Sequence, residues 1–467
     1  MQSRRDQVQA QSYVWSRLVT ALVVADADAA ENPNRRTVVG TVSGLLVAAL
    51  VVVGFTVYGF LRPGGASAWQ KPGVLVVEKE TGSRYLYVGN RLRPVLNYSS
   101  ARLMFPAEPK VVSVSRRSLA AVPHGQPVGI VGAPDALPPP GRVAGQLWTV
   151  CAAAAPDQTG RTTTATTLAI TAAGAAGGRA LAPDEAVLAR AGDRTYLLWR
   201  GYRLRLAADW MPRVLGADGG AAPVEESWLE TVPAGPDLAP PDVPERGAPG
   251  PLVDGRPTRI GQLFVARTAN GAERHYLLRR DGLSPLGSLA YAIVAADPAT
   301  ARLYDGGPVR PEELSLAALA QAPTSDRPVL PAGVPAELPR ILPARPPGGA
   351  WCARHRMADG GVQIVADAPV TVAGMVTDGL ALRRGSRTAA AVSVAPGQGG
   401  LVVAGRFGQA LGPDRYLVTD AGVKYPVADA DSAARLGFPA SDARPVPARL
   451  LDLLPTGPAL GTAMVLG

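Results

Sequence analysis

The sequence predicts an α+β, β-rich protein. A single N-terminal transmembrane helix precedes four β-meander/helix repeats, which surround a central disulfide-linked β core with pseudo-two-fold symmetry. Three observations carry this prediction: an uncharged run from Thr37 to Leu61, a hairpin motif that occurs four times, and a cysteine in each of two long inserts. A chain of 467 residues allows two to four domains, each able to bury its own core.

The charge pattern excludes one class of partner. The formal net charge is +9, but the excess looks thinly spread and forms no long run of like charges. Basic stripes interleaved with aromatic residues, zinc-finger spacings and RNA-recognition signatures are also absent from the sequence. The excess is therefore interpreted as a solvated surface, and no nucleic-acid partner is predicted.

The run TVVGTVSGLLVAALVVVGFTVYGFL covers residues 37–61, which are 25 residues without a charge. As a helix it would be about 37 Å long, enough to cross a hydrocarbon core of about 30 Å with some tilt. A cleaved signal peptide is the alternative, because Ala66-Ser67-Ala68 resembles a cleavage site. The run is longer than a signal h-region and 36 residues precede it, so an uncleaved signal anchor is favoured.

Two helical faces near the N-terminus predict contacts with other helices or with lipid. Gly40 and Gly44 form a GxxxG pattern and Ala48 continues it by one turn, which would let another membrane helix approach closely. Residues 1–36 form a predicted cytoplasmic amphipathic tail. One face of its helix could lie on the inner membrane surface or dock on a cytoplasmic partner. This face consists of Val8, Trp15, Leu18, Val19 and Leu22.

The orientation of the span depends on two weak signals. The twenty residues on either side carry three Lys or Arg each, and only the adjacent pair Arg35-Arg36 favours a cytoplasmic N-terminus. The two cysteines, Cys151 and Cys352, both lie on the C-terminal side. An isolated pair in an exported domain most simply forms a disulfide, with two buried free thiols as the alternative.

Four hairpin motifs resemble one another: RYLYVGNRL from Arg84, RTYLLWRGYRLRL from Arg194, RHYLLRRDGL from Arg274 and DRYLVTDAGVKYPV from Asp414. Each follows another apolar strand and contains a Gly-bearing turn, so each unit begins as a three-stranded antiparallel meander. Each unit ends in a Leu-x-x-apolar-Pro tail, where proline stops one helical turn. The tail prolines lie 38, 37, 47 and 39 residues after the motif tyrosines.

The order of repeats and inserts indicates a duplicated half. The predicted segments after the span are 62–127 for a linker and repeat 1, 128–186 for the first part of the core, 187–237 for repeat 2, 238–262 for a Pro-rich linker, 263–325 for repeat 3, 326–400 for the second part of the core, and 401–467 for repeat 4 with the C-terminal tail. If the inserts pack together, a Cys151–Cys352 bridge crosses between the halves and stabilises the fold by roughly 5 kcal/mol. A linear solenoid is the alternative, but it would not separate neighbouring repeats with unlike inserts.

No catalytic, cofactor or metal site is predicted. His124, His275 and His355 are scattered, without HxxxH, HExxH or CxxC spacing. None of the four lysines follows a glycine, so there is no Walker A loop to cradle phosphates, and the GxSxG motif is absent. Cys352 precedes His355 by three residues, but a disulfide explains this cysteine better than a nucleophile does.

The N-terminal stretch RRDQVQAQSYVWSRLVTALVVADAD, the following NPNRR, the single span and the hairpin repeats with one cysteine pair together resemble the EccB family of type VII (ESX) secretion systems. The resemblance implies a single-pass inner-membrane protein with a cytoplasmic N-terminus. It also implies a periplasmic ectodomain of repeats around a disulfide-bonded core. The implied partners are the EccC motor ATPase, EccD, EccE and a mycosin protease.

Three functions are considered. The first is a membrane-anchored structural component that scaffolds and oligomerises the secretion channel, with self-association and contact with the lipid bilayer. The second is ATP hydrolysis, because EccB-like proteins are also described as ATPases; ATP is a cofactor only under this alternative. The absent Walker A motif and the lack of an ATP pool outside the membrane argue against it. The third is binding of cell-wall glycan, for which the sequence offers no specific residue.

Overall fold

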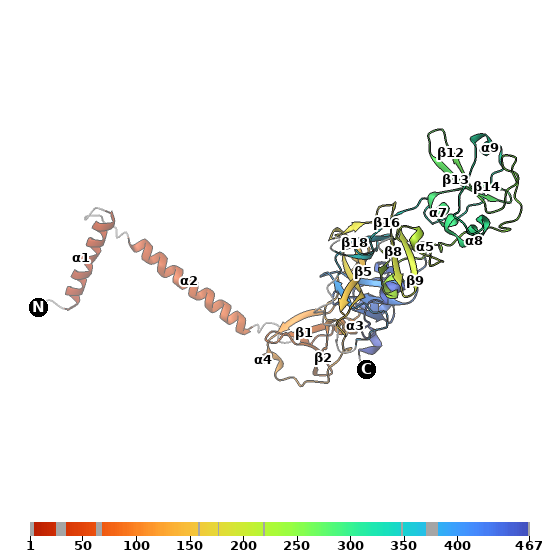
Figure 1. Ribbon diagram of the computed structural model, residues 1–467. Helices are drawn as coiled ribbons and strands as arrows, with labels where there is room; N and C mark the ends of the chain where they lie inside the picture. The colour runs from red at the N-terminus through yellow and green to blue at the C-terminus, as the bar shows by residue number, and fades with distance from the viewer. Residues whose placement is uncertain are drawn as a thin grey trace.

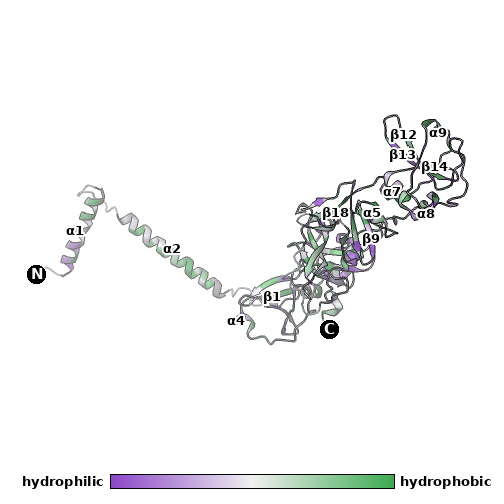
Figure 2. Ribbon diagram, in the orientation of Figure 1, coloured by the Kyte–Doolittle hydropathy of each residue, from purple (hydrophilic) through white to green (hydrophobic). Residues whose placement is uncertain are grey.

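The computed structural model describes residues 4–24, 34–61, 68–156, 159–175, 177–217, 220–346, 349–369 and 382–465. The chain begins with two long helices, α1 (Arg4–Val24) and α2 (Asn34–Leu61), shown in red and orange in Figure 1. Within α2, Thr37–Tyr58 is long and apolar enough to cross a membrane, and Figure 2 shows hydrophobic residues in green along this helix. None of its apolar window (0%) is buried. An apolar helix without protein cover needs another apolar phase around it, which agrees with the predicted span.

Four small sheets share one topology, and each contains one of the predicted meanders. In every sheet three consecutive strands pair antiparallel, and a fourth strand pairs in parallel with the first. The fourth strand is not in the sequence prediction. In sheet order the strands are β3 (Arg91–Pro94), β2 (Arg84–Val88), β1 (Val74–Glu78) and β4 (Lys110–Val114); β10 (Tyr202–Arg205), β9 (Arg194–Trp199), β8 (Glu185–Ala191) and β11 (Ala222–Pro223); β14 (Gly282–Leu286), β13 (Glu273–Arg279), β12 (Leu263–Arg267) and β15 (Glu312–Glu313); and β22 (Lys424–Val427), β21 (Arg415–Val418), β20 (Gly400–Ala404) and β23 (Arg444–Val446).

Short helices carry the chain from the third strand of each sheet to the fourth. Side chains cap the N-termini of several of these helices. The Asn97 carboxamide oxygen accepts from the Ser100 N–H at 3.0 Å, and the Asp429 carboxylate accepts from the Ser432 N–H at 2.7 Å. The crossover helices are α3 (Tyr98–Met104), α5 (Met211–Val214), α7 (Ser288–Ala296), α8 (Pro298–Ala301) and α10 (Ala430–Arg435). Single 3₁₀ turns are η1 (Ala68–Gln70), η2 (Val143–Gly145), η3 (Ala173–Ala175), η4 (Arg302–Tyr304), η5 (Ala440–Asp442) and η6 (Thr462–Met464).

The predicted Leu-x-x-apolar-Pro tails are helical turns, and each protects an edge of its sheet. After the proline the chain runs beside the third strand, so that Leu92 pairs with His124 and Arg203 with Ala234. This pairing covers backbone groups that an edge strand would leave unpaired. The tail helices are α4 (Arg116–Leu119), α6 (Glu226–Leu229), α9 (Leu316–Gln321) and α11 (Ala448–Leu451).

The two inserts form one six-stranded sheet at the centre of the protein. In sheet order it consists of β19 (Ala391–Val394), β6 (Thr162–Ala172), β5 (Gln146–Pro156), β17 (Ala350–Arg356), β18 (Val362–Asp367) and β7 (Arg179–Ala180). The hairpin β5–β6 comes from the first insert and β17–β18 from the second, and β5 pairs antiparallel with β17 in the middle. Each insert also sends a strand to the outer side of the other hairpin, because β7 pairs with β18 and β19 with β6. The predicted pseudo-two-fold core is confirmed for the two hairpins, with its axis between β5 and β17, whereas the outer strands differ because β19 pairs parallel and β7 antiparallel.

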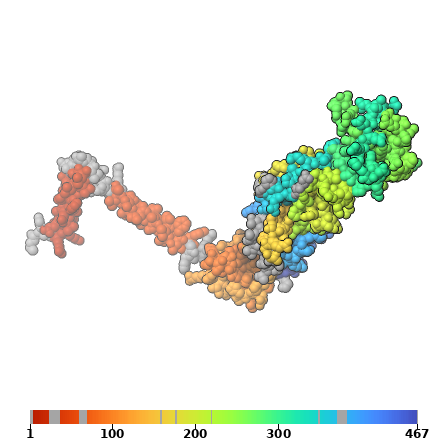
Figure 3. All heavy atoms as spheres, viewed as in Figure 1, coloured from red at the N-terminus to blue at the C-terminus, as the bar shows by residue number. Residues whose placement is uncertain are grey.

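The repeats pack in an order that differs from their order in the sequence. Repeat 1 contacts repeat 4 through Leu103 and Phe438, and the Arg102 Nε donates to the Arg435 carbonyl at 2.8 Å. Repeats 2 and 3 share a cluster that includes Met211, Leu215, Leu289 and Ile293. Both pairs meet at the central sheet, so the body is elongated, with repeat 1 (orange) and repeat 3 (green) at its two ends (Figures 1 and 3). A solenoid would keep sequence neighbours adjacent, and this alternative does not hold.

The Pro-rich segment 238–262 is part of a core and not an exposed connection. Val243 and Ile260 are buried beside Leu263 and Leu277 of repeat 3. The Arg246 guanidinium lies 3.0 Å from the Asp297 carboxylate, and both side chains are largely buried. Apolar and ionic contacts therefore both hold this segment against repeat 3.

The hairpin turn of repeat 2 is fitted against the central sheet. Arg200 and Gly201 have φ angles of 46° and 79°, as a two-residue turn with positive φ requires. A Cβ atom on Gly201 would lie 2.1 Å from the carbonyl oxygen of Val362 in β18. Glycine is therefore needed here both for the turn and for the close approach of the two backbones.

Candidate functional site

The disulfide lies on the pseudo-two-fold axis. Cys151 of β5 and Cys352 of β17 are directly opposite each other in the strand register, with their Cα atoms 4.0 Å apart. Both sulfurs are buried beside Ala350 and Val365. The bond joins residues 201 positions apart and links the two halves of the body, as the sequence predicts.

The nearby histidine does not form a catalytic pair with the cysteine. His355 is three residues beyond Cys352 in the same strand, so the two side chains point to opposite faces of the sheet. The imidazole is 2% exposed, lies opposite Trp148 in the register, and its Nε2 has no hydrogen-bond partner among the described residues. Burial lowers the pKa of His355 to about 4, so the ring is neutral at physiological pH.

A buried carboxylate ties three segments together at the start of β8. Glu185 is 2% exposed and forms ion pairs with Arg179 of β7 and with Arg340 of β16 (Arg340–Leu342), a strand of the second insert that pairs with β8. The backbone N–H of Ala182 and then the Arg179 guanidinium hold the pKa of Glu185 below its ordinary value. This cluster joins both inserts to repeat 2, and its groups are all engaged in structural contacts.

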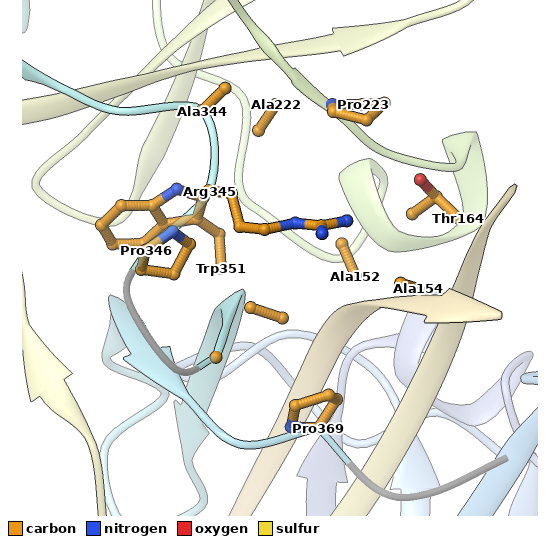
Figure 4. Close-up of a pocket in the computed structure, with 12 residues that line it drawn as sticks. Ala152, Ala154, Thr164, Ala222, Pro223, Ala344, Arg345, Pro346, Trp351 and Pro369 are labelled. Atoms are coloured by element: carbon orange, nitrogen blue, oxygen red, sulfur yellow. The ribbon is translucent and has the colours of Figure 1, made fainter. Parts of the chain in front are cut away.

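A cavity of 450 Å³ opens between the central sheet and repeat 2 (Figure 4). The Arg345 side chain extends into it toward Ala152 and Thr164, as Figure 4 shows. Among the described lining residues Arg345 carries the sole charge, and the others are mainly alanine, proline and Trp351. One guanidinium in an apolar cavity can hold an anion, but this lining supplies no carboxylate or imidazole to act as a base. No pattern in the sequence points to this cavity, because its residues come from both inserts and repeat 2.

The histidines do not come together as a metal centre. Within the described ranges no group of three or more His, Cys, Asp or Glu side chains could hold a metal ion. His124 lies beside the Tyr85 ring at a centroid distance of 5.4 Å, and His275 stacks on Tyr291 at 3.7 Å. Both rings serve packing in their own repeats.

The predicted face on α1 is solvent-exposed. Val8, Trp15 and Leu18 are 65%, 65% and 52% exposed, and Leu22 is 80% exposed; Val19 lies between them and is partly covered. At 3.6 residues per turn these five side chains span about 100° of the helix surface. Tyr13 and Val14 are also exposed, so apolar groups extend beyond the predicted face. The face stays a prediction of a membrane or partner contact.

The small-residue face on α2 is also unoccupied. A Cβ atom on Gly40 or Gly44 would meet no described atom within 4 Å, so both positions leave room for another helix. Ala48 lies one turn further along the same helix. The geometry permits the close helix approach that the sequence predicts, and the partner helix stays a prediction.

Known proteins resemble this chain in both sequence and fold. The sequence model described as "Type VII secretion system ESX-1, transport TM domain B" matches residues 1–466. The chain is 29% identical to the ESX-3 secretion system ATPase EccB3 of Mycolicibacterium smegmatis, over 99% of this chain and 90% of that protein. It is 27% identical to the ESX-5 secretion system ATPase EccB5 of Mycobacterium marinum, over 99% of this chain and 92% of that protein.

Two solved structures resemble the fold described above. The EccB3 dimer from the ESX-3 core complex is 27% identical and has a TM-score of 0.63, covering 84% of this chain and 100% of that one. A chain of the periplasmic assembly from the ESX-5 inner membrane complex has a TM-score of 0.67 at 24% identity, covering 87% of this chain and 98% of that one. Because the family's sequence model spans nearly the whole chain, this protein belongs to the EccB family of type VII (ESX) secretion systems.

Proposed function

We propose that this protein is a membrane-anchored scaffold that oligomerises a type VII secretion channel on the periplasmic side. The observation that carries the proposal is a body of four repeats with shared cores, which follows the one candidate membrane span among the described residues. Repeats that share cores cannot move independently, so the body can hold partners at fixed positions. The similar EccB3 protein from the ESX-3 core complex is a dimer, which supports self-association.

The proposed topology places α1 in the cytoplasm and the repeats in the periplasm. The pair Arg35-Arg36 and the disulfide in the repeat-bearing body support it, because disulfides persist in oxidising compartments. The proposed partners are the EccC motor ATPase, EccD, EccE and a mycosin protease. In this scheme the α1 face meets a cytoplasmic partner or the inner membrane surface, and Gly40, Gly44 and Ala48 pack against another membrane helix.

Co-purification from the native membrane tests the scaffold. The full chain carries an affinity tag, is solubilised in mild detergent, and its companions are identified by mass spectrometry. We expect the other membrane components of the secretion system. Recovery of the chain alone, or only with wall-synthesis enzymes, contradicts the proposal.

Two adjacent alanines provide a matched test of the helix face on α2. Ala48→Leu places a larger side chain on the small-residue face, whereas Ala49→Leu makes the same change about 100° away. We expect Ala48→Leu to reduce the amount of co-purified membrane partners and Ala49→Leu to leave it unchanged. Equal recovery in both variants would show that this face does not pack against another helix.

ATP hydrolysis is the competing function, because the curated relatives carry ATPase in their names. The cavity at Arg345 is where the body could hold an anion such as a phosphate. We expect the purified full chain to release no phosphate from ATP above a no-protein control. Turnover that Arg345→Ala abolishes and Arg345→Lys preserves would establish the enzyme instead of the scaffold alone.

A further inference from the structure

Repeat 1 carries most of the net charge of the protein. Residues 62–127 contain ten Lys or Arg and three Asp or Glu, a net charge of +7 out of +9 for the whole chain. Repeat 3 occupies the symmetry-equivalent position, and its residues 263–325 contain six basic and six acidic residues, a net charge of 0. The same fold therefore does not require the surplus, and the charge is concentrated and not thinly spread as composition alone suggests.

Three of the basic residues lie at one end of the repeat 1 sheet. The parallel strands β1 and β4 both begin at this end, while β2 ends and β3 begins there. Lys71 precedes Gly73, whose carbonyl accepts from the Lys110 N–H at 3.0 Å. Arg91 is the first residue of β3 and pairs with Val88, the last residue of β2. We call Lys71, Arg91, Lys110, Val88 and Val111 the basic end.

The side chains of the basic end are available to a ligand. Lys71, Arg91 and Lys110 are exposed and form no salt bridge with any residue in the described part of the chain. Val88 and Val111 are 52% and 55% exposed beside them. Three unpaired cations and two exposed apolar side chains thus lie at the same end of the sheet.

The carboxylates of repeat 1 are used elsewhere. Glu108 is the nearest in sequence to Lys110, but it is paired with Arg102 at 3.2 Å and accepts from the Tyr98 hydroxyl. At the opposite end of the sheet Glu78 accepts from Arg116 at 2.6 Å, and Glu80 accepts from the Arg116 N–H. The positive charge of the opposite end is largely compensated, whereas that of the basic end is not.

The basic end is also the end nearest in sequence to the membrane helix. Trp69 is 1% exposed and packs edge-on against Tyr87 with a centroid distance of 5.1 Å, so the chain is anchored to the sheet from this residue onward. Six residues separate Leu61, the last residue of α2, from Ala68, the first of η1. A fully extended chain between these two Cα atoms spans at most about 25 Å. The basic end is therefore held within reach of the lipid headgroups where α2 ends.

We propose that the basic end docks on anionic lipid headgroups of the leaflet at which α2 ends. This inference rests on α2 spanning the membrane, which is part of the proposed function. Lys71, Arg91 and Lys110 pair with lipid phosphates, and Val88 and Val111 enter the interface between headgroups and acyl chains. Docking sets the angle between the elongated body and the membrane, and so the position of repeat 3 at the far end.

The test uses the full chain in lipid nanodiscs of phosphatidylcholine with or without phosphatidylglycerol. Gln70 is exposed next to the basic end, and Gln70→Cys provides one reactive thiol because both native cysteines form the disulfide. A fluorophore on this thiol is quenched by headgroup-labelled nitroxide lipid when the basic end docks. We expect strong quenching in anionic discs, weak quenching in neutral discs, and loss of quenching at high salt.

Two variants at opposite ends of the sheet separate this surface from general charge; one removes three positive charges and the control removes two. Each basic side chain near an anionic surface contributes about fivefold to binding, so Lys71→Gln/Arg91→Gln/Lys110→Gln should reduce the docked-to-undocked ratio about 100-fold. Lys79→Gln/Arg117→Gln changes the opposite end and should leave quenching unchanged. Equal quenching in neutral and anionic discs, or equal loss in both variants, overturns the proposal. Recovery of the chain with the discs on size exclusion measures membrane insertion separately, so a failure of α2 is distinguishable from a failure of docking.

Discussion

Removal of the central disulfide should destabilise the body by several kcal/mol. The variant Cys151→Ala/Cys352→Ala removes a bond between residues 201 positions apart. For a closed loop of that length the chain-entropy expression gives about 5 kcal/mol at 25 °C. The two small side chains that replace the sulfurs leave the neighbouring Ala350 and Val365 in place, so loss of packing adds little. We expect a loss of about 3–5 kcal/mol in the free energy of unfolding.

Tryptophan fluorescence during guanidinium unfolding of the detergent-solubilised chain measures this loss. Trp148 and Trp351 are buried in β5 and β17, close to the disulfide, and report on the central sheet. The wild-type chain with reductant is the control, since it loses the bond and keeps both side chains. It should unfold at the same denaturant concentration as the double variant. A loss below about 1 kcal/mol in both samples would refute the reasoning, because the two halves would then be held by strand pairing alone.

Three further predictions use the same unfolding measurement. Gly201→Ala should lower the free energy of unfolding by at least about 2 kcal/mol, because this position combines a positive φ with a backbone clash. The control Gly192→Ala has a φ of 59° and open space around it, so it should cost only about 1 kcal/mol. Equal losses in the two variants would contradict the close approach to β18. His355 has a folded-state pKa of about 4 against an ordinary value of 6.5. Its contribution to stability is therefore complete above pH 6.5 and falls by roughly 3 kcal/mol as the pH drops toward 4. His355→Phe should lose that pH dependence, and an unchanged profile would show that another group causes it. Arg340→Met should lower the free energy of unfolding by about 1–3 kcal/mol, because the buried Glu185 carboxylate loses one of its two arginine partners. Glu185 keeps Arg179 and the Ala182 N–H, and Arg340→Lys should recover part of the loss. No change in Arg340→Met would show that Arg179 alone compensates this carboxylate.

The duplicated architecture lets one fold serve two different ends. Repeats 1 and 3 are equivalent under the pseudo-two-fold axis, and each packs on a neighbour that comes from the other half. Their net charges are nevertheless +7 and 0 over residues 62–127 and 263–325. Symmetry therefore accounts for the shape of the body but not for the distribution of its charge.

Local sequence was sufficient for the secondary structure of the repeats and for the membrane segment. The glycine-bearing turns fix where the meanders reverse, as Gly89 and Asn90 show with φ angles of 58° and 61°. The tail prolines end the helical turns, because proline cannot continue a helix. The placement of one cysteine in each insert predicted the central bond, and the structure joins Cys151 to Cys352. The turns and helix ends depend on neighbours a few residues apart, so local sequence patterns indicate them.

The pairing of distant segments was decided only in the tertiary structure. The fourth strand of repeat 2 is just Ala222–Pro223 and that of repeat 3 just Glu312–Glu313, too short to show any alternation of side chains. The exchange of β7 and β19 between hairpins, the burial of segment 238–262 and the cavity at Arg345 all arise from residues far apart in sequence. The basic end likewise depends on the parallel pairing of β1 with β4, which brings Lys110 beside Gly73, two residues after Lys71. Turn and helix signals act over a few residues, whereas these features depend on packing energies that no local pattern contains.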